Sequence, residues 1–299
     1  MQLFNFGSIN WDHCYQLTHF VRPGETISSD TYQKLLGGKG ANQSAAAARA
    51  GAKVFHVGAV GGDESQAQSL LKELGVDVSG TVALVGAETG HAIIQINQDG
   101  ENAIVLFAGA NHGLTESQIN EQLDKAAQGD WVLLQNETNL IEFVVEQAKS
   151  RGLNVAFNPA PMDKDLTLKV LPHLDLLIVN EIELQDLTAT EDKAKAEAMA
   201  MEWSSNLEML VTQGSAGVNY YHKGEKQFCS AFKVDAVDTT AAGDTFIGYF
   251  MASKLAGASV EISLKTACAA SAISVTRAGA IPSIPAHTEV EQFIQKQEK

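Results

Sequence analysis

One carboxylate stands between a short flexible segment and an apolar stretch. Asp244 follows residues 241–243, Ala-Ala-Gly, and residues 246–255 are predicted to form a helix. This order places free main-chain N–H groups and the positive end of a helix dipole around the carboxylate. An anion can bind those N–H groups while Asp244 removes a proton from a hydroxyl, as phosphoryl transfer to an alcohol requires. No Lys or Arg lies between Lys233 and Lys254, so phosphate binding here would depend on the backbone.

A second glycine-rich segment, residues 37–43 (Gly-Gly-Lys-Gly-Ala-Asn-Gln), precedes an alanine-rich helix. It is not a Walker A loop, because Gln33 stands where the first glycine belongs and Gly40 follows the lysine. It could be a turn that caps the helix, with Lys39 in solvent. It could also let the backbone approach a small polar ligand, with Lys39 and Asn42 as donors, but taken alone the segment favours the capping turn.

Polar residues follow several predicted strands. Asn10 and Asp12 alternate to one side of the chain, where they could bind vicinal hydroxyls at the carboxyl edge of an open sheet. Glu137 also follows a strand. Asn and Asp are common in turns, and taken alone these residues favour ordinary turn chemistry.

Two further groups could bind a nucleotide and its cations. Asn180 and Glu183 share one face of a nascent helix, either to organise water around Mg²⁺ or as a capping box. The glycine loop at residues 212–217 could contact a nucleotide or simply turn the chain. Carbonyls of the loop at 277–283, together with Asp238, could hold a monovalent cation, although such loops are common.

These residues require a scaffold, and the pattern of the chain predicts one. Strand-like and helix-like segments alternate, which is typical of a mostly parallel sheet covered by helices. Strands are predicted at residues 3–6, 54–60, 131–135, 155–158, 176–180 and 208–212, helices at 40–50, 64–74, 140–149, 246–255, 261–276 and 289–296, and an edge hairpin at 218–229.

Two regions interrupt this alternation. Residues 91–107 have a hairpin pattern with a favoured two-residue turn at Asp99-Gly100. Residues 12–36 contain short extended stretches and no long helical period. We predict that both contribute to one small sheet, which would form a lid over the site. The predicted organisation is one α/β domain over residues 1–299, with lid segments at about 12–36 and 90–108.

Composition narrows the class of protein. Apolar residues make up 45% of the 299 residues, enough for an extensive core. A net charge of −15 argues against nucleic-acid or anionic-membrane partners. The three cysteines are far apart, the eight histidines lack metal-ligand spacing, and residues 1–6 carry no basic leader. We expect a soluble cytoplasmic protein with reduced thiols.

Taken in order, the motifs resemble the ribokinase family of carbohydrate kinases (PfkB-type). Residues 37–43 and 238–248 are similar to the two family signatures, and the similarity spans essentially the whole chain. Smaller similar motifs lie at residues 8–10, 23–26, 108–111, 158–161 and 275–283.

The resemblance implies a three-layer α/β/α fold with a mostly parallel central sheet and a small β-sheet lid, through which two chains form a homodimer. It implies ATP-dependent phosphorylation of the primary (5-) hydroxyl of D-ribose or a close relative, with ATP, Mg²⁺ and K⁺ as cofactors. A kinase for another sugar or a nucleoside is the alternative. A non-catalytic sugar or nucleotide sensor is a further one, although a sensor does not need Asp244 as a base.

The resemblance also implies roles for residues. Asp244 would be the base, beside an anion hole formed by Ala242 and Gly243. The sugar would be bound by Asn10, Asp12, Gly38, Lys39, Asn42, Glu137 and Asp244. ATP would be bound by Asn180, Thr212, Gly214, Ser215, Gly217, Gly243 and Cys268, with Glu183 near Mg²⁺. The residues around K⁺ would be Asp238, Thr240, Ser274, Arg277, Gly279 and Ser283, mostly through backbone oxygens.

The chain departs from the family pattern at three positions. Trp11 stands between the two sugar residues where a small residue is usual, Ile247 replaces an Asn, and Cys268 replaces a polar residue beside adenine. Strand alternation predicts that Trp11 faces away from Asn10 and Asp12.

Overall fold

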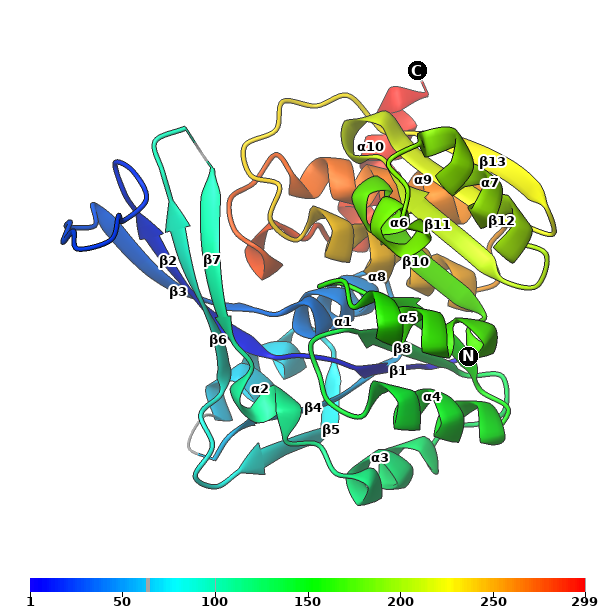
Figure 1. The fold of residues 1–299 in the computed structure, drawn as a ribbon, viewed down its shortest axis with the longest axis horizontal. Helices are drawn as coiled ribbons and strands as arrows, with labels where there is room; N and C mark the ends of the chain where they lie inside the picture. The colour runs from blue at the N-terminus through cyan, green and yellow to red at the C-terminus, as the bar shows by residue number, and fades with distance from the viewer. Residues whose placement is uncertain (63–64, 100, 299) are drawn as a thin grey trace.

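The computed structural model describes residues 1–62, 65–99 and 101–298. Its main body is built around a large twisted sheet, and a smaller sheet projects from one side of that body (Figure 1). Two predicted positions, Glu64 at a helix start and Gly100 in a hairpin turn, lie outside the described residues.

The large sheet is parallel from β5 to β11 and ends in an antiparallel hairpin. In spatial order its strands are β13 (Glu225–Ser230), β12 (Gly217–His222), β11 (Glu208–Thr212), β10 (Leu176–Asn180), β9 (Asn154–Asn158), β8 (Trp131–Gln135), β1 (Leu3–Phe6), β4 (Val54–Gly61) and β5 (Asp77–Leu84).

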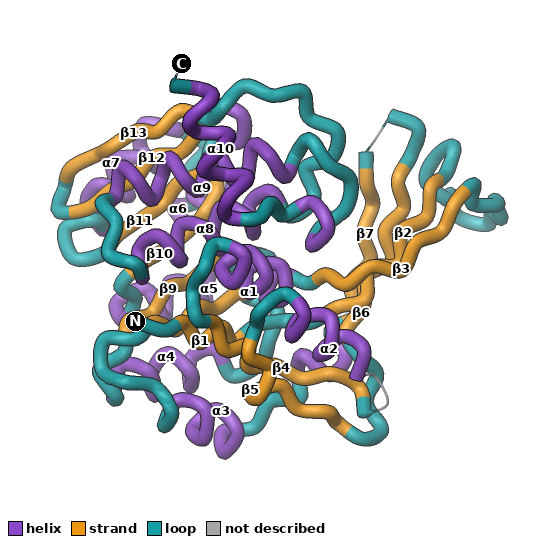
Figure 2. Tube along the Cα trace, turned by 180° about the vertical axis from the view of Figure 1, so that it is seen from behind, coloured by secondary structure: helices purple, strands orange, loops and turns teal. Residues whose placement is uncertain are grey.

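Helices cover both faces of this sheet. Alternate strand residues enter separate apolar clusters: Leu3 packs with one helical layer, and Phe4 with the other. Figure 2 shows the first layer from behind. That layer contains α1 (Lys39–Arg49), α2 (Ser65–Glu73), α8 (Ala242–Leu255), α9 (Val260–Ser274) and α10 (His287–Gln297). The other contains α3 (Glu116–Leu123), α4 (Ile141–Ser150), α5 (Lys164–Val170), α6 (Glu181–Thr188) and α7 (Lys193–Trp203).

The small sheet is assembled from two distant parts of the chain. Its order is β3 (Thr31–Gly37), β2 (Asn10–Gln16), β6 (Gly90–Ile96) and β7 (Asn102–Phe107). β2 runs parallel to β6 and antiparallel to β3. The predicted pairing of the two regions is therefore present, and it begins at Asn10, two residues before the predicted boundary.

Helices α1 and α8 lie against each other and position the site (Figures 1 and 2). Gly248 allows this contact, because a Cβ there would lie 2.4 Å from Ala46 Cβ and 2.7 Å from the Ala47 nitrogen. Because the two helices pack closely at Gly248, their first turns, one helical turn before this contact, also lie side by side.

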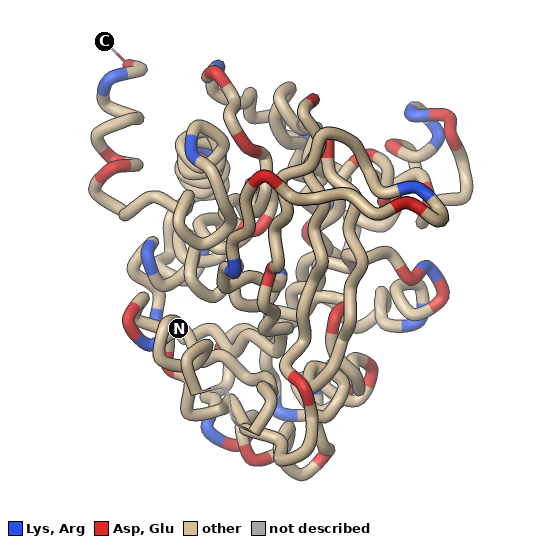
Figure 3. The backbone as a smooth tube through the Cα atoms, turned by 90° about the vertical axis from the view of Figure 1, so that its left-hand side faces the viewer, with Lys and Arg blue, Asp and Glu red and all other residues tan. Residues whose placement is uncertain are grey.

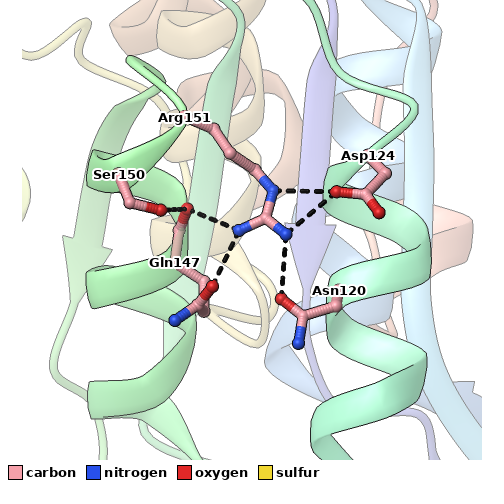
Figure 4. A network of polar contacts seen from close by, with 5 residues as sticks. All are labelled: Asn120, Asp124, Gln147, Ser150 and Arg151. Carbon is pink, nitrogen blue, oxygen red and sulfur yellow. Dashed lines mark hydrogen bonds and ion pairs between the residues drawn. The ribbon is translucent and has the colours of Figure 1, made fainter.

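Away from the contact between α1 and α8, polar side chains link neighbouring helices. Arg151, after α4, donates to Asp124 Oδ1 at 2.9 and 3.0 Å and to Asn120 Oδ1 at 2.9 Å, joining α4 to α3 (Figure 4). Lys and Arg positions are interspersed with Asp and Glu in the view of Figure 3. Such exposed ion pairs contribute about 0–1 kcal/mol each, so stability rests mainly on the two apolar layers.

The structure differs from the sequence prediction in several elements. Helices α3, α5 and α7 and strand β5 were not predicted. Helix α8 starts at Ala242, not at residue 246, so Asp244 lies inside its first turn. Within the described residues, no helix combines the length and the apolar character needed to cross a bilayer.

Candidate active site

Asp244 occupies the first turn of α8. The helix follows Ala241, whose φ of 58° is left-handed, a conformation that is costly for alanine. The Ala242 N–H contacts Thr239 O at 3.2 Å, and the first intrahelical bond runs from Thr245 to Ala241. The Gly243 N–H therefore belongs to the turn whose N–H groups lack intrahelical acceptors.

Both carboxylate oxygens of Asp244 accept hydrogen bonds from α1. Asn42 Nδ2 donates to Oδ2 and Gln43 Nε2 donates to Oδ1, each at 2.9 Å. All three side chains are buried. Asn42 was predicted at this site, whereas Gln43 was noted only as the last residue of its motif. The sequence carries no signal that distinguishes Gln43 from a helix-surface glutamine.

A cavity of about 250 Å³ lies beside Asp244 at the carboxyl edge of the large sheet. Predicted residues in its lining are Lys39, Asn180, Glu183, Thr212, Ala242, Gly243 and Asp244. Residues that were not assigned to the site also line it: Asn158, Ala160, Ile178, Val179, Thr239, Ala241 and Ile247. The space next to Gly243 is open, since a Cβ there would meet no atom within 4 Å.

Lys39 and Glu137 lie together at the start of α1. Glu137 Oε2 accepts the Lys39 N–H at 3.1 Å and the Ser8 hydroxyl. Burial raises the pKa of Glu137, against the opposing effect of Lys39. For Lys39, burial lowers the pKa but the carboxylates of Asp244, Glu137, Glu183 and Asp12 outweigh it, so its pKa is raised. Lys39 is thus a persistent cation among acids.

Asp12, on β2, is another buried acid of the site whose pKa is raised. Burial raises its pKa to about 7, with further contributions from Glu137 and Asp244 and a smaller opposing one from Lys39. Gly37 is needed beside it, because a Cβ at residue 37 would lie 1.9 Å from an Asp12 oxygen. Asp12 therefore titrates near neutral pH, unlike an exposed aspartate.

Asn10 is held by a residue that the prediction did not include in the site. Asn111 Nδ2 donates to Asn10 Oδ1 at 2.7 Å, while Asn111 Oδ1 accepts the Ile9 N–H at 2.9 Å. Gly38 is the N-cap of α1, next to Asn10. The predicted sugar residues Asn10, Asp12, Gly38, Lys39, Asn42 and Glu137 thus surround the start of α1.

A larger cavity, about 600 Å³, separates the small sheet from two loops of the main body. Asp12, Cys14 and Gln16 of β2 line one side, and residues 236–240 and 278–280 line the other. Its neighbours on the sheet include Thr31, Gln33, Leu35, Ile94, Ile96, Asp99 and Asn102.

Asp238 ties these two loops together. Its carboxylate accepts the N–H groups of Thr240 at 2.9 Å and Gly279 at 2.8 Å. Burial opposes its ionisation, but these hydrogen bonds prevail and its pKa is lowered. A permanent carboxylate within irregular backbone has the donor chemistry that suits a hard cation.

The other predicted cation residues have partners of their own. The Arg277 side chain turns away to Glu289, at 2.6 Å. The hydroxyls of Ser274 and Ser283 donate to nearby carbonyls at 2.8 and 2.7 Å. These three residues could therefore contribute backbone oxygens more readily than side chains.

Asn180 and Glu183 form the capping box that the sequence left open. Asn180 Oδ1 accepts the Glu183 N–H, and Glu183 Oε2 accepts the Asn180 N–H, both at 2.8 Å. Within the described part of the chain, no group of three or more His, Cys, Asp or Glu residues could hold a metal ion. A Mg²⁺ ion here would depend on phosphate and water for most of its ligands, as is usual for this ion.

The other residues predicted to bind the nucleotide are not among the residues that line either cavity. Gly214 and Ser215 lie in the turn between β11 and β12, and Gly217 begins β12. Cys268 is buried on α9, and its thiol lowers the pKa of the Cys229 thiol.

Trp11 faces away from the cavities, as strand alternation predicted. It is only 5% exposed, packs in the apolar cluster that contains Ile9 and Leu36, and lies beneath the Lys34 ammonium, 4.2 Å from its ring centre. The bulky residue between Asn10 and Asp12 consequently does not narrow the site.

Comparisons with known proteins agree on a family. The family described as pfkB family carbohydrate kinase matches residues 2–287. The ribokinase of Haemophilus influenzae is 37% identical over 297 residues, which cover 97% of each chain.

Solved structures are similar along the whole chain. Ribokinase from Cryptococcus neoformans in complex with ADP has a TM-score of 0.87 at 37% identity, covering 97% of this chain and 98% of that one. Arabidopsis thaliana ribokinase complexed with ribose and ATP has a TM-score of 0.85 at 32% identity, with 98% of each chain covered. The predicted α/β/α fold with a small sheet is confirmed.

Proposed function

The chain belongs to the pfkB family of carbohydrate kinases, and we propose that it transfers the γ-phosphoryl group of ATP to the primary (5-) hydroxyl of D-ribose or a close relative. The observation that carries this proposal is the position of Asp244. It lies in the first turn of α8, borders the smaller cavity and is held by two amides from α1. A base beside a helix N-terminus suits proton removal from a hydroxyl that attacks a phosphate.

The sugar is bound between the small sheet and the start of α1. Asn42 uses its Nδ2 on Asp244, and its buried Oδ1 has no hydrogen-bond partner among the described residues. That unpartnered oxygen would accept a sugar hydroxyl once substrate binding opens the contacts that enclose it. Asp12 and Asn10 accept or donate to the vicinal hydroxyls, and Gly38, Lys39 and Glu137 complete the set. The hydroxyl that faces Asp244 is the one that reacts.

The phosphates are bound on the other side of Asp244. The N–H groups of Ala242 and Gly243 form the anion hole, with the Ala242 N–H exchanging its 3.2 Å contact to Thr239 O for the phosphate. The missing side chain of Gly243 leaves room for the transferring group. Asn180, Thr212 and the turn with Gly214, Ser215 and Gly217 hold the nucleotide, with Cys268 near its base.

Two cations support this arrangement. Glu183 would lie near a Mg²⁺ ion bound to the phosphates, and that ion would supply charge neutralisation during transfer. Asp238 and Thr240 would hold K⁺, with backbone oxygens near Ser274, Arg277, Gly279 and Ser283. A K⁺ ion there would stabilise the loop that leads into α8.

The small sheet acts as a lid and as the homodimer interface. Its closure would exclude water that could otherwise accept the phosphoryl group. Exposed apolar residues, which we call the lid patch, support pairing with a second chain: Tyr32, Ile93, Ile104, Val105, Leu106 and Phe107.

The test of this function is the Asp244→Asn variant. We expect kcat with D-ribose to fall by roughly 10²–10⁴-fold, the usual contribution of a general base. Coupled ADP detection measures turnover. The substituted amide can still accept from Gln43 Nε2 through its oxygen, while its NH2 group requires the Asn42 amide to reverse and accept. Turnover near that of the unmodified enzyme would rule out the assigned role.

The size of the larger cavity favours one alternative, a bulkier sugar or a nucleoside as acceptor. A panel of D-ribose, 2-deoxy-D-ribose, a ketohexose and a purine nucleoside, each in K⁺ and in Na⁺, separates the possibilities. Activity on the nucleoside but not on ribose would support the alternative. Binding without turnover of any compound would indicate a sensor.

A further inference from the structure

A chain of buried polar side chains ends at Asp244, and the proposed mechanism does not use it. Gln43 Nε2 donates to Asp244 Oδ1, and Gln43 Oε1 accepts from Gln135 Nε2 at 2.7 Å. Gln135 Nε2 also donates to Asn5 Oδ1 at 2.9 Å. Asn5, Gln43 and Gln135 each have no exposed surface. This network of hydrogen-bonded side chains extends from α8 through α1 to the ends of β8 and β1.

Each amide in this chain has one possible orientation. Asn5 Nδ2 donates both hydrogens, to Gly40 O and to Ser44 Oγ at 2.8 Å each. Asn5 must therefore present its oxygen to Gln135, and Gln135 must donate to Gln43. Gln43 consequently turns its oxygen toward Gln135 and its N–H groups toward Asp244.

The far end of the chain is fixed as well. Ser44 Oγ lies 2.8 Å from His56 Nδ1, and His56 Nε2 lies 3.1 Å from Gly7 O. Because a carbonyl only accepts, Nε2 carries the hydrogen and Nδ1 accepts from Ser44. Burial lowers the pKa of His56 to about 4, so the ring stays neutral.

The second hydrogen of Gln43 Nε2 holds it from another side. It donates to Asn158 Oδ1 at 3.2 Å, and Asn158 Nδ2 in turn donates to Ile178 O at 3.0 Å. A reversed Gln43 amide would place its oxygen against the Asp244 carboxylate and against Asn158 Oδ1. It would also set two N–H groups against each other at Gln135. The network therefore commits Gln43 to donate to Asp244.

We propose that Gln43 is a positioning residue, which holds the Asp244 carboxylate in the orientation that reaches the acceptor hydroxyl. This inference rests on the proposed role of Asp244. Asn42 restrains the other carboxylate oxygen, but Asn42 is also a proposed sugar ligand and would change partners when substrate binds. Gln43 is fully enclosed, so its hold on Asp244 does not depend on substrate.

The Gln43→Met variant tests the proposal. Methionine has similar length and no amide, so it fills the space but cannot donate. We expect kcat to fall by about 10- to 100-fold, as for a reacting group displaced by about 1 Å. KM for sugar and for ATP should change by less than about 3-fold, since Gln43 lies outside both cavity linings.

The matched control is Gln122→Met. Gln122 on α3 is likewise a buried glutamine, and its Oε1 accepts from Lys125 at 2.8 Å, away from the site. This control shares the loss of a buried amide but should leave kcat unchanged. Equal losses of kcat in both variants would overturn the proposal.

A double-variant cycle separates positioning from a structural role. If Gln43 acts through Asp244, adding Gln43→Met to Asp244→Asn should lower the residual kcat by less than about 3-fold. If Gln43→Met lowers kcat by the same factor in the Asp244→Asn background as it does alone, the proposal is overturned. Should Gln43→Met fail to fold, Gln135→Met removes the donor that orients Gln43, and it should lower kcat with unchanged KM; an unchanged kcat would overturn the proposal.

The cycle also distinguishes the two hypotheses. Full activity of Asp244→Asn alone would reject the proposed base, whatever Gln43 does. A strong loss in Asp244→Asn together with an unaffected Gln43→Met would reject only the positioning role.

Discussion

Three acids and one lysine share the space at the start of α1. Asp12, Glu137 and Asp244 lie near Lys39, which cannot balance all three charges. Burial and mutual repulsion raise the pKa of Asp12 to about 7 and that of Glu137 above its ordinary value. Sites that bind polar ligands commonly hold such perturbed groups. We therefore expect the affinity for the sugar to depend on whether Asp12 is protonated.

We expect kcat/KM for the sugar to rise with pH through about 7. Below this pKa Asp12 is protonated, and above it the carboxylate accepts stronger hydrogen bonds from sugar hydroxyls. A pH profile of kcat/KM at saturating ATP measures the inflection. Asp12→Asn should remove it; an inflection that persists in this variant would assign the titration to another group, such as Glu137.

At the scale of elements, two helix starts meet because two helix interiors fit closely. Gly248 of α8 lies against Ala46 and Ala47 of α1, and this contact sets Asn42 and Gln43 beside Asp244 one turn earlier. The site is thus a consequence of helix packing, and distant volume changes should be transmitted to it.

Gly248→Ala should therefore damage both stability and activity. The added Cβ would meet Ala46 Cβ at 2.4 Å, the Ala47 nitrogen at 2.7 Å and Gln43 O at 2.8 Å. We expect a loss of about 1–3 kcal/mol in the free energy of unfolding, as for an overpacked core, together with a lower kcat. Chemical denaturation and steady-state kinetics measure the two effects.

Gly243→Ala provides the comparison for stability. Its Cβ would meet no atom within 4 Å, so the free energy of unfolding should not fall. Equal destabilisation by both substitutions would show that helix packing at Gly248 is not the cause.

At the scale of the whole molecule, a compact α/β body carries a thin sheet with little cover of its own. The lid patch exposes 64% of Val105 and 50% of Phe107, on a strand at the edge of that sheet. An apolar edge strand readily pairs with another chain. A second copy of the chain is the partner that we propose for it.

Val105→Lys should weaken the homodimer by about 10-fold or more, because it would bury a charge at the interface. Sedimentation over a range of concentrations measures the association. Val85→Lys is the matched control, since Val85 is 96% exposed and lies outside the lid patch. Indistinguishable association of the two variants would contradict the lid interface.

The sequence determined more of the local chemistry than of its surroundings. Alternation predicted the buried strands and the direction of Trp11, because side-chain period follows directly from backbone geometry. The glycine-rich motifs predicted roles for Asp244, Asn42 and Lys39, because such segments before a helix leave backbone N–H groups free to bind a ligand. The prediction missed Gln43, Asn111 and Asn158, because their partners are distant in the sequence. Gln43 meets Asp244 across 201 residues and Asn158 across 115. Asn111 meets Asn10 across 101 residues and Ile9 across 102.

Only the tertiary structure decided which polar residues share hydrogen bonds and which acids have a raised pKa. The capping box of Asn180 and Glu183 was one of two possibilities until the strand and helix were in place. The pKa of Asp12 likewise depends on burial and on acids from α8 and the β8 end. By itself, the sequence specified Asp244 and the residue types around it. Burial, orientation and charge at that site arise from contacts between distant segments, and a linear pattern does not contain them.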